Sequence, residues 1–174
     1  MDSFIDLARS QDELARIFVR LGLAKEGETP AATPLAGGVS SGIFRVDTGS
    51  GSYCLKQALP RLKVEKEWKV PVDRVFAELA WLDTAGSIVP GHVPKVLGVD
   101  EKTKSFVMEF LAADHAVWKS ELLEGRVDVG IARQVGDIIG RIHQATAHCA
   151  DCARRFDNDD NFHAIRLEPY LVET

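Results

Sequence analysis

The sequence predicts an α+β protein in which a small antiparallel sheet of about five strands packs against one helix. Three observations predict this class. Short strand-like runs separated by turn residues fill residues 33–58. A helical apolar stripe divides them from two further strand-like runs, at 93–99 and 105–111. The residues after 111 return to a helical period, and 174 residues suffice for one domain with a hydrophobic core.

A helix is expected close to the amino terminus. Its apolar residues recur at helical intervals: Leu14, Ile17, Phe18 and Leu21. Ser10 and Glu13 have the spacing of a capping box, and Gly22 is placed to end the helix. Residues 24–33 are polar and contain proline, which is typical of a linker. The pattern leaves open whether this helix covers the sheet or forms a dimer contact.

A meander of three strands is expected next, at residues 33–36, 43–47 and 53–58. A glycine-rich loop, residues 37–42, joins the first strand to the second. In the third strand Tyr53 and Leu55 share one face, while Cys54 and Lys56 share the other, because successive side chains of a strand alternate.

A helix over residues 68–85, closed by Gly86, follows the meander. Its apolar stripe consists of Val72, Val75, Phe76, Leu79 and Leu82. Glu78 projects beside this stripe. After the two remaining strands, helices are expected over residues 116–123 and 127–147, and a polar tail begins at Asp151.

Composition excludes several classes of protein. The chain carries 21 basic and 26 acidic residues, and a net charge of -5 argues against a binder of nucleic acid polymers. No apolar run approaches the ~20 residues that a membrane span needs. Three cysteines are too few for a disulfide framework, and the amino terminus does not resemble a secretory signal, so we expect a cytoplasmic protein.

Lys56 and Glu78 are the candidate catalytic pair. A glutamate beside the buried stripe of the helix can reach a lysine on the facing side of the sheet, and such a pair positions the ammonium for anionic phosphates. The glycine-rich loop alone is a weak signal, because Ile43 and Phe44 stand where a Walker A loop carries Lys and Ser or Thr. The alternative is that both groups are ordinary solvated charges.

The order of several segments carries a resemblance to a known family. These segments are Leu35–Val46 (LAGGVSSGIFRV), Lys56–Pro60, Trp68, Asp73–Glu78, Met108–Leu111, Gly140–His143 and Arg166–Tyr170. Together they resemble the aminoglycoside phosphotransferase and small-molecule kinase superfamily, which has a protein-kinase-like fold, and within it the methylthioribose kinases. The resemblance implies three regions: a helix and linker over 1–32, a kinase-like N-lobe with its hinge over 33–111, and the beginning of a helical C-lobe over 112–174.

The resemblance also implies roles for particular residues. Gly37, Gly38 and Gly42 would shape a loop over ATP. Lys56 would bind the α- and β-phosphates, and Glu78 would orient Lys56. The backbone of Glu109 and Leu111 would pair with adenine, and Met108 would pack beside its ring. For Met108 the alternative is an ordinary place in the apolar core of the sheet.

The implied activity is ATP-dependent phosphorylation of a hydroxyl on a small molecule, such as an aminoglycoside, methylthioribose or a related sugar or amino alcohol. The family's catalytic H-x-D loop has no counterpart in these residues, so we expect a truncated form that is inactive alone. No metal ligand is assigned, and Mg²⁺ is expected only in the complete enzyme. Self-association through an exposed truncated face is also expected.

Two alternatives remain. One is a noncatalytic nucleotide-binding or protein-interaction module derived from a kinase. The other is a zinc-stabilised protein, in which Cys149 and Cys152 bind the metal together with nearby histidines such as His148 and His163. An EF-hand over residues 157–168 is disfavoured, because Phe162 stands where the calcium loop needs glycine.

Overall fold

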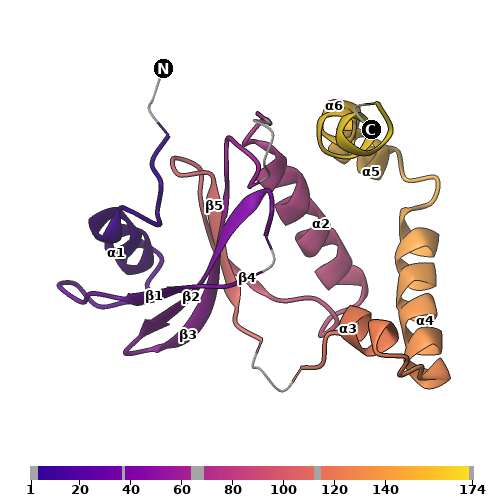
Figure 1. Ribbon diagram of the computed structural model, residues 1–174, viewed down its shortest axis with the longest axis horizontal. Coiled ribbons are helices and arrows are strands. Elements are labelled where there is room, and N and C mark those ends of the chain that lie inside the picture. The colour runs from indigo at the N-terminus through magenta and orange to yellow at the C-terminus, as the bar shows by residue number, and fades with distance from the viewer. Residues whose placement is uncertain (1–3, 37, 64–68, 112–114, 173–174) are drawn as a thin grey trace.

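A five-stranded antiparallel sheet forms the centre of the fold, with strand order β1-β2-β3-β5-β4 (Figure 1). The structure, a computed structural model, describes residues 4–36, 38–63, 69–111 and 115–172. The strands are β1 (Ala31–Pro34), β2 (Ser41–Thr48), β3 (Gly51–Ala58), β4 (Val96–Asp100) and β5 (Ser105–Glu109). The predicted α+β class is confirmed, and the central strand of the sheet is the one that carries Lys56.

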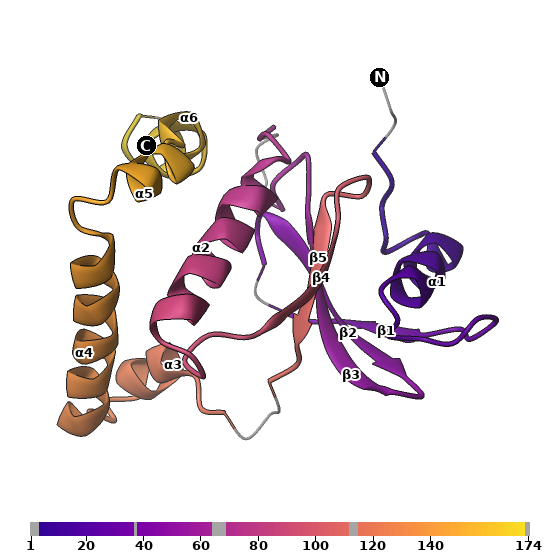
Figure 2. The same cartoon turned by 180° about the vertical axis from the view of Figure 1, so that it is seen from behind.

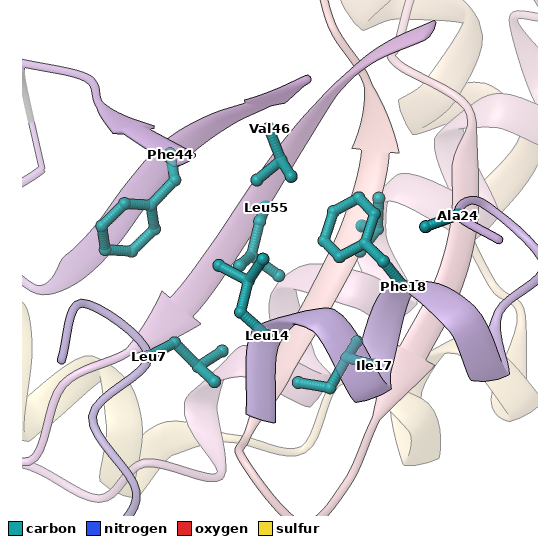
Figure 3. Packing of buried hydrophobic residues seen from close by; sticks show 9 residues of the cluster. Leu7, Leu14, Ile17, Phe18, Ala24, Phe44, Val46 and Leu55 are labelled. Atoms are coloured by element: carbon teal, nitrogen blue, oxygen red, sulfur yellow. The ribbon is translucent and has the colours of Figure 1, made fainter. Parts of the chain in front are cut away.

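Helix α1 (Gln11–Arg20) covers one face of the sheet. Its buried residues Leu14, Ile17 and Phe18 pack against apolar side chains of the strands, as Figure 3 shows. The strand side of this cluster consists of Phe44, Val46, Leu55 and Val107. The amino-terminal helix is therefore a cover on the sheet, which answers the question that the sequence pattern left open.

The predicted capping box at the start of α1 is wrong. The Ser10 side chain makes no capping hydrogen bond. Glu13 instead accepts hydrogen bonds from Arg16, at 2.9 Å, and from Lys102, at 2.8 Å. The Glu13 carboxylate thus links α1 to the turn between β4 and β5, and tertiary ion pairs take the place of the local cap.

Helix α2 (Arg74–Ile88) covers the opposite face of the sheet (Figure 2). Val75 and Leu82 of α2 pack against Ala58 of β3 and Phe106 of β5. The helix runs past Gly86, so the prediction that Gly86 ends it is wrong. Gly86 is instead a place of close packing, where an added Cβ would lie 3.3 Å from the side chain of Val93.

Gln57 of β3 is fully buried on the α1 face, and its side-chain amide is fully used. Its Oε1 accepts from the Leu7 N–H at 3.0 Å, and its Nε2 donates to the carbonyls of Ile5 and Thr103 at 2.7 and 2.8 Å. The segment before α1 and the turn between β4 and β5 are therefore joined through one side chain of the central strand.

The chain continues into helices on the outer side of α2. They are α3 (Trp118–Leu123), α4 (Val129–Thr146), α5 (Ala150–Arg155), α6 (Asp159–Phe162) and the π-helix η1 (His163–Val172). Both views show α4 running beside α2 on the side away from the sheet. The tail from Asp151 is thus helical, although its polar composition indicated only a tail. Arg155 of α5 holds it to α2 by bonds to Asp83, at 2.8 Å, and Thr84, at 3.2 Å.

Large apolar side chains remain exposed on α3, α4 and the connection between them: Leu122, Leu123, Val127, Val129, Ile131 and Ile139. Among the helices of the described residues, none combines the length and the apolar character that crossing a bilayer requires. The self-association expected from exposed apolar surface stays a prediction.

Candidate functional site

Lys56 and Glu78 meet where the central strand faces α2. Lys56 Nζ lies 2.5 Å from Glu78 Oε1. The Lys56 side chain is 19% exposed and that of Glu78 is 39% exposed, so the pair is partly screened by solvent. The alternation of β3 turns Lys56 toward α2, and Glu78 lies three residues after the buried Val75 on the facing side of the helix.

A cavity of about 450 Å³ opens at this pair. Ser40, Ser41, Lys56, Arg74, Glu78 and Trp81 line the side formed by the sheet and α2. The tail lines the other side with Phe156, Asn158, Asn161, Phe162, Ile165 and Arg166. Cationic and amide groups thus surround one carboxylate, Glu78, which suits the cavity to a polar ligand that carries negative charge.

The glycine-rich loop is placed differently from the expectation. Gly37 lies outside the described residues. Gly42 is part of β2, where it is paired with Gln57, so it does not belong to the loop. Gly38 does lie in the loop, and an added Cβ there would stand 2.7 Å from the Ser41 carbonyl oxygen. Close approach of backbone to backbone therefore accounts for glycine at position 38.

The carbonyl groups of the loop are turned toward the connection between β3 and α2. The Val39 oxygen accepts from the Lys63 N–H at 2.8 Å. The Ser40 oxygen accepts from the Leu59 N–H at 3.1 Å and from Arg74 Nη2. Arg74 is a residue to which sequence reasoning gave no role. The signal for it was an arginine at the first turn of a helix that follows the loop by about thirty residues, and that signal is not specific.

The proposed adenine contacts lie at the far end of β5. Met108 pairs with Cys54 across β5 and β3, so it shares the face that carries Lys56. The Glu109 N–H donates to the Lys95 carbonyl at 3.0 Å, and its carboxylate accepts from the Lys95 N–H at 2.9 Å. Leu111 follows the strand and is 51% exposed. Met108, Glu109 and Leu111 do not line the cavity that Lys56 lines.

Burial raises the pKa of the Cys54 thiol, on the same face of β3, above its ordinary value. The Lys56 ammonium opposes this rise in the pKa, and the Glu78 carboxylate adds to it. Cys54 is therefore a neutral, buried thiol beside the ion pair. This position argues for a packing role and against a role as nucleophile.

The two remaining cysteines, Cys149 and Cys152, form a disulfide. Cys149 immediately precedes α5, and Cys152 lies in its first turn. In the part of the chain that the structure describes, no three His, Cys, Asp or Glu side chains are grouped so that they could hold a metal ion. The structure therefore gives no support to the zinc alternative.

The amino-acid sequence is similar to that of known proteins over most of its length. The phosphotransferase enzyme family matches residues 31–173. A methylthioribose kinase of Geobacillus sp. (strain WCH70) is 36% identical over 127 residues, which are 71% of this chain and 31% of the relative. One of Geobacillus thermodenitrificans (strain NG80-2) is 32% identical over 76% of this chain and 34% of the relative. The chain thus spans about a third of the length of these curated relatives.

Proposed function

The chain belongs to the phosphotransferase enzyme family, and on that premise we propose that its sheet and α2 bind the phosphates of ATP for transfer to a small molecule. The observation that carries the proposal is the ion pair between Lys56 Nζ and Glu78 Oε1, at 2.5 Å, on the wall of a cavity. The described residues would then form the nucleotide-binding part of a small-molecule kinase.

The ion pair suits phosphate binding for a simple chemical reason. A lysine ammonium has three donors. Glu78 accepts one of them, which fixes the direction of the other two. Those donors can then bind oxygens of two adjacent phosphates, and the positive charge stabilises the negative charge that spreads over the phosphate oxygens during transfer.

We propose that adenine lies beside Met108 and pairs with the backbone carbonyl of Glu109 and the N–H of Leu111. The position of Met108 next to Cys54, on the same face as Lys56, supports this orientation. Gly38 would let the loop approach the phosphates closely. Gly42 would act indirectly, by starting β2 beside the loop, and a role for Gly37 stays a prediction from the sequence.

The implied Mg²⁺ does not fit the described residues. Among the described residues that line the cavity, Glu78 is the only carboxylate, and it is paired with Lys56. Magnesium in kinases is held by oxygen ligands that include carboxylates. We therefore assign no step to the ion and no catalytic base to these residues.

We propose a hydroxyl of methylthioribose, or of a related sugar or amino alcohol, as the acceptor of the phosphoryl group. The names of the Geobacillus relatives described above, both methylthioribose kinases, support this choice. A nucleotide-binding module without transfer is the second candidate. It is favoured by the absence of a magnesium donor set among the described residues that line the cavity.

Calorimetric titration of the 174-residue chain with ATP, ADP and adenosine tests the proposal. We expect the wild-type chain to bind ATP. Lys56→Met should weaken ATP binding about tenfold or more, while its affinity for adenosine stays within about twofold of the wild-type value. Lys102→Met is the matched control, because Lys102 pairs with Glu13 on the other side of the sheet. Absence of ATP binding, or equal binding by Lys56→Met, would overturn the proposal. ADP formation with methylthioribose separates the kinase from the binding module.

A further inference from the structure

Arg74, the first residue of α2, is a buried cation whose acceptors are all backbone carbonyls. Its residue exposure is 8%. Nη1 donates to the Pro71 oxygen at 2.6 Å, and Nη2 donates to the Leu59 oxygen at 2.9 Å and to the Ser40 oxygen. Within the described ranges no carboxylate forms an ion pair with it. Arg74 therefore joins the loop, the end of β3 and the approach to α2.

A buried arginine that pairs with no carboxylate of the described residues needs an explanation, because taking a charge out of water is costly. Burial lowers the pKa of Arg74, while the Glu78 carboxylate one helical turn later raises it. The three carbonyl dipoles replace the water that the guanidinium loses. A methionine could fill the same volume but has no N–H donor, whereas the planar guanidinium divides its donors between Nη1 and Nη2 and so reaches carbonyls of three separate residues.

The bond from Arg74 to the Ser40 carbonyl, together with the backbone bonds from Leu59 and Lys63, fixes the direction of the loop peptides. The described chain has no cis peptide bond. In a trans peptide the carbonyl of one residue and the N–H of the next point in opposite directions. Since the Val39 and Ser40 carbonyls point to the connection between β3 and α2, the N–H groups of Ser40 and Ser41 point away from that connection. Ser40 and Ser41 both line the cavity that contains Lys56.

One face of α2 therefore makes both attachments. Arg74 and Glu78 are four residues apart, so they lie on the same side of the helix. Arg74 holds the Ser40 carbonyl, and Glu78 holds the Lys56 ammonium. Any displacement of α2 moves the loop and the lysine together.

We propose that Arg74 is a positioning residue, which holds loop residues 38–41 in register with Lys56 so that both meet the same phosphate group. The identity of the ligand, a phosphate group, rests on the proposed function. The fixing of the loop by Arg74 does not depend on that function. Arg74 acts through the Ser40 carbonyl, since both of its terminal nitrogens are already used by backbone oxygens.

Two variants and a control test this role. Arg74→Met removes the charge and the donors, and Arg74→Lys keeps the charge but not the planar fork. Arg20→Met is the matched control, because Arg20 is the last residue of α1, on the opposite face of the sheet, and pairs with Asp100 at 2.6 Å. The readouts are calorimetric affinities for ATP and adenosine, and hydrogen exchange of the peptide covering residues 38–43 without any nucleotide.

We expect Arg74→Met to weaken the binding of ATP about tenfold and the binding of adenosine by less than about twofold. Exchange of the loop amides should become about tenfold faster in Arg74→Lys, and Arg20→Met should change neither readout. A structural role alone would weaken both ligands equally, and that result, or unchanged ATP binding, would overturn the inference.

The exchange measurement separates this inference from the proposed function. If the wild-type chain does not bind ATP, the proposed function is wrong, and loop exchange alone decides whether Arg74 holds the loop. Unchanged loop exchange in Arg74→Lys rejects that hold. If Arg74→Met does not fold, the affinities and exchange of Arg74→Lys decide in its place.

Discussion

Lys56 Nζ and Glu78 Oε1, 2.5 Å apart, join the central strand of the sheet to the helix packed on it. The contact links residues 22 positions apart in sequence. The pair lines a cavity that is also lined by Arg74 and by Ser40, whose carbonyl Arg74 binds. The lysine, the glutamate and the loop therefore meet at the same cavity.

Removing the charge of Glu78 tests whether the pair is functional or only structural. In Glu78→Gln we expect ATP to bind about three- to tenfold more weakly, because the Lys56 ammonium is no longer held in one direction. Stability should fall by less than about 1 kcal/mol, since both side chains reach solvent. Calorimetric titration and thermal unfolding measure the two effects. Unchanged ATP affinity would contradict an orienting role.

Gly38 and Gly136 differ in the space that a methyl group would meet. In Gly38→Ala the new Cβ would approach the Ser41 carbonyl oxygen to 2.7 Å, so the loop must shift, and we expect ATP affinity to fall about fivefold or more. Gly136 of α4 has nothing within 4 Å, so Gly136→Ala should stabilise the fold by up to about 1 kcal/mol. Equal effects of the two changes on ATP binding would refute this account of Gly38.

The Cys54 thiol should react slowly. Because burial raises its pKa, the reactive thiolate forms only at higher pH than for an ordinary cysteine. With iodoacetamide at about pH 8 we expect labelling at least about tenfold slower in the folded chain than in the chain unfolded by guanidinium. Mass spectrometry of the peptide that contains Cys54 measures both rates. Labelling at the unfolded rate would show that the thiol is accessible.

The stability of the fold should fall in acid through Glu13. Hydrogen bonds from Lys102 and then Arg16 lower the pKa of the Glu13 carboxyl below its ordinary value of 4.5. A carboxyl with a lowered pKa stabilises the fold above the unfolded pKa, and this contribution disappears as pH falls through the folded pKa. Thermal unfolding at pH values from about 6 down to about 3 should show a smaller acid loss in Glu13→Gln than in the wild type. If the stabilities of the wild type and Glu13→Gln fell equally with pH, Glu13 would not be a source of the acid sensitivity.

Leu14 and Leu123 form a matched pair for the core. Leu14 is fully buried between α1 and the sheet, whereas Leu123 is 78% exposed. Leu14→Ala should cost about 2–5 kcal/mol of unfolding free energy, and Leu123→Ala should stay within about 0.5 kcal/mol. Urea unfolding of both variants is the measurement. A small loss in Leu14→Ala would mean that α1 is not a firm cover on the sheet.

Much of the N-terminal fold could be predicted from the sequence, because its signals are local. Alternation of side chains located Lys56 on one face of β3, and the apolar stripe located Glu78 beside the buried face of α2. These two periods suffice to suggest that the residues meet. The strand limits differ from the expectation by only a few residues, since turn residues bound the strands on both sides.

The features that sequence reasoning missed depend on distant backbone. Arg74 acts through carbonyls of Ser40, Leu59 and Pro71, and no local pattern indicates that these meet. Gly42 belongs to β2 because its pairing with Gln57 extends the strand into the loop. Ser10 and Glu13 have capping-box spacing, but the Glu13 carboxylate accepts a hydrogen bond from Lys102, 89 residues away, and not from the start of its own helix.

The two edges of the sheet limit how the chain can associate. β1, at one edge, is four residues long and ends in Pro34, which has no N–H to offer an added strand. β4, at the other edge, has an irregular register between Val96 and Gly98. Neither edge presents a long, regular row of free backbone groups, so the sheet resists growing into fibrils by edge-to-edge strand addition.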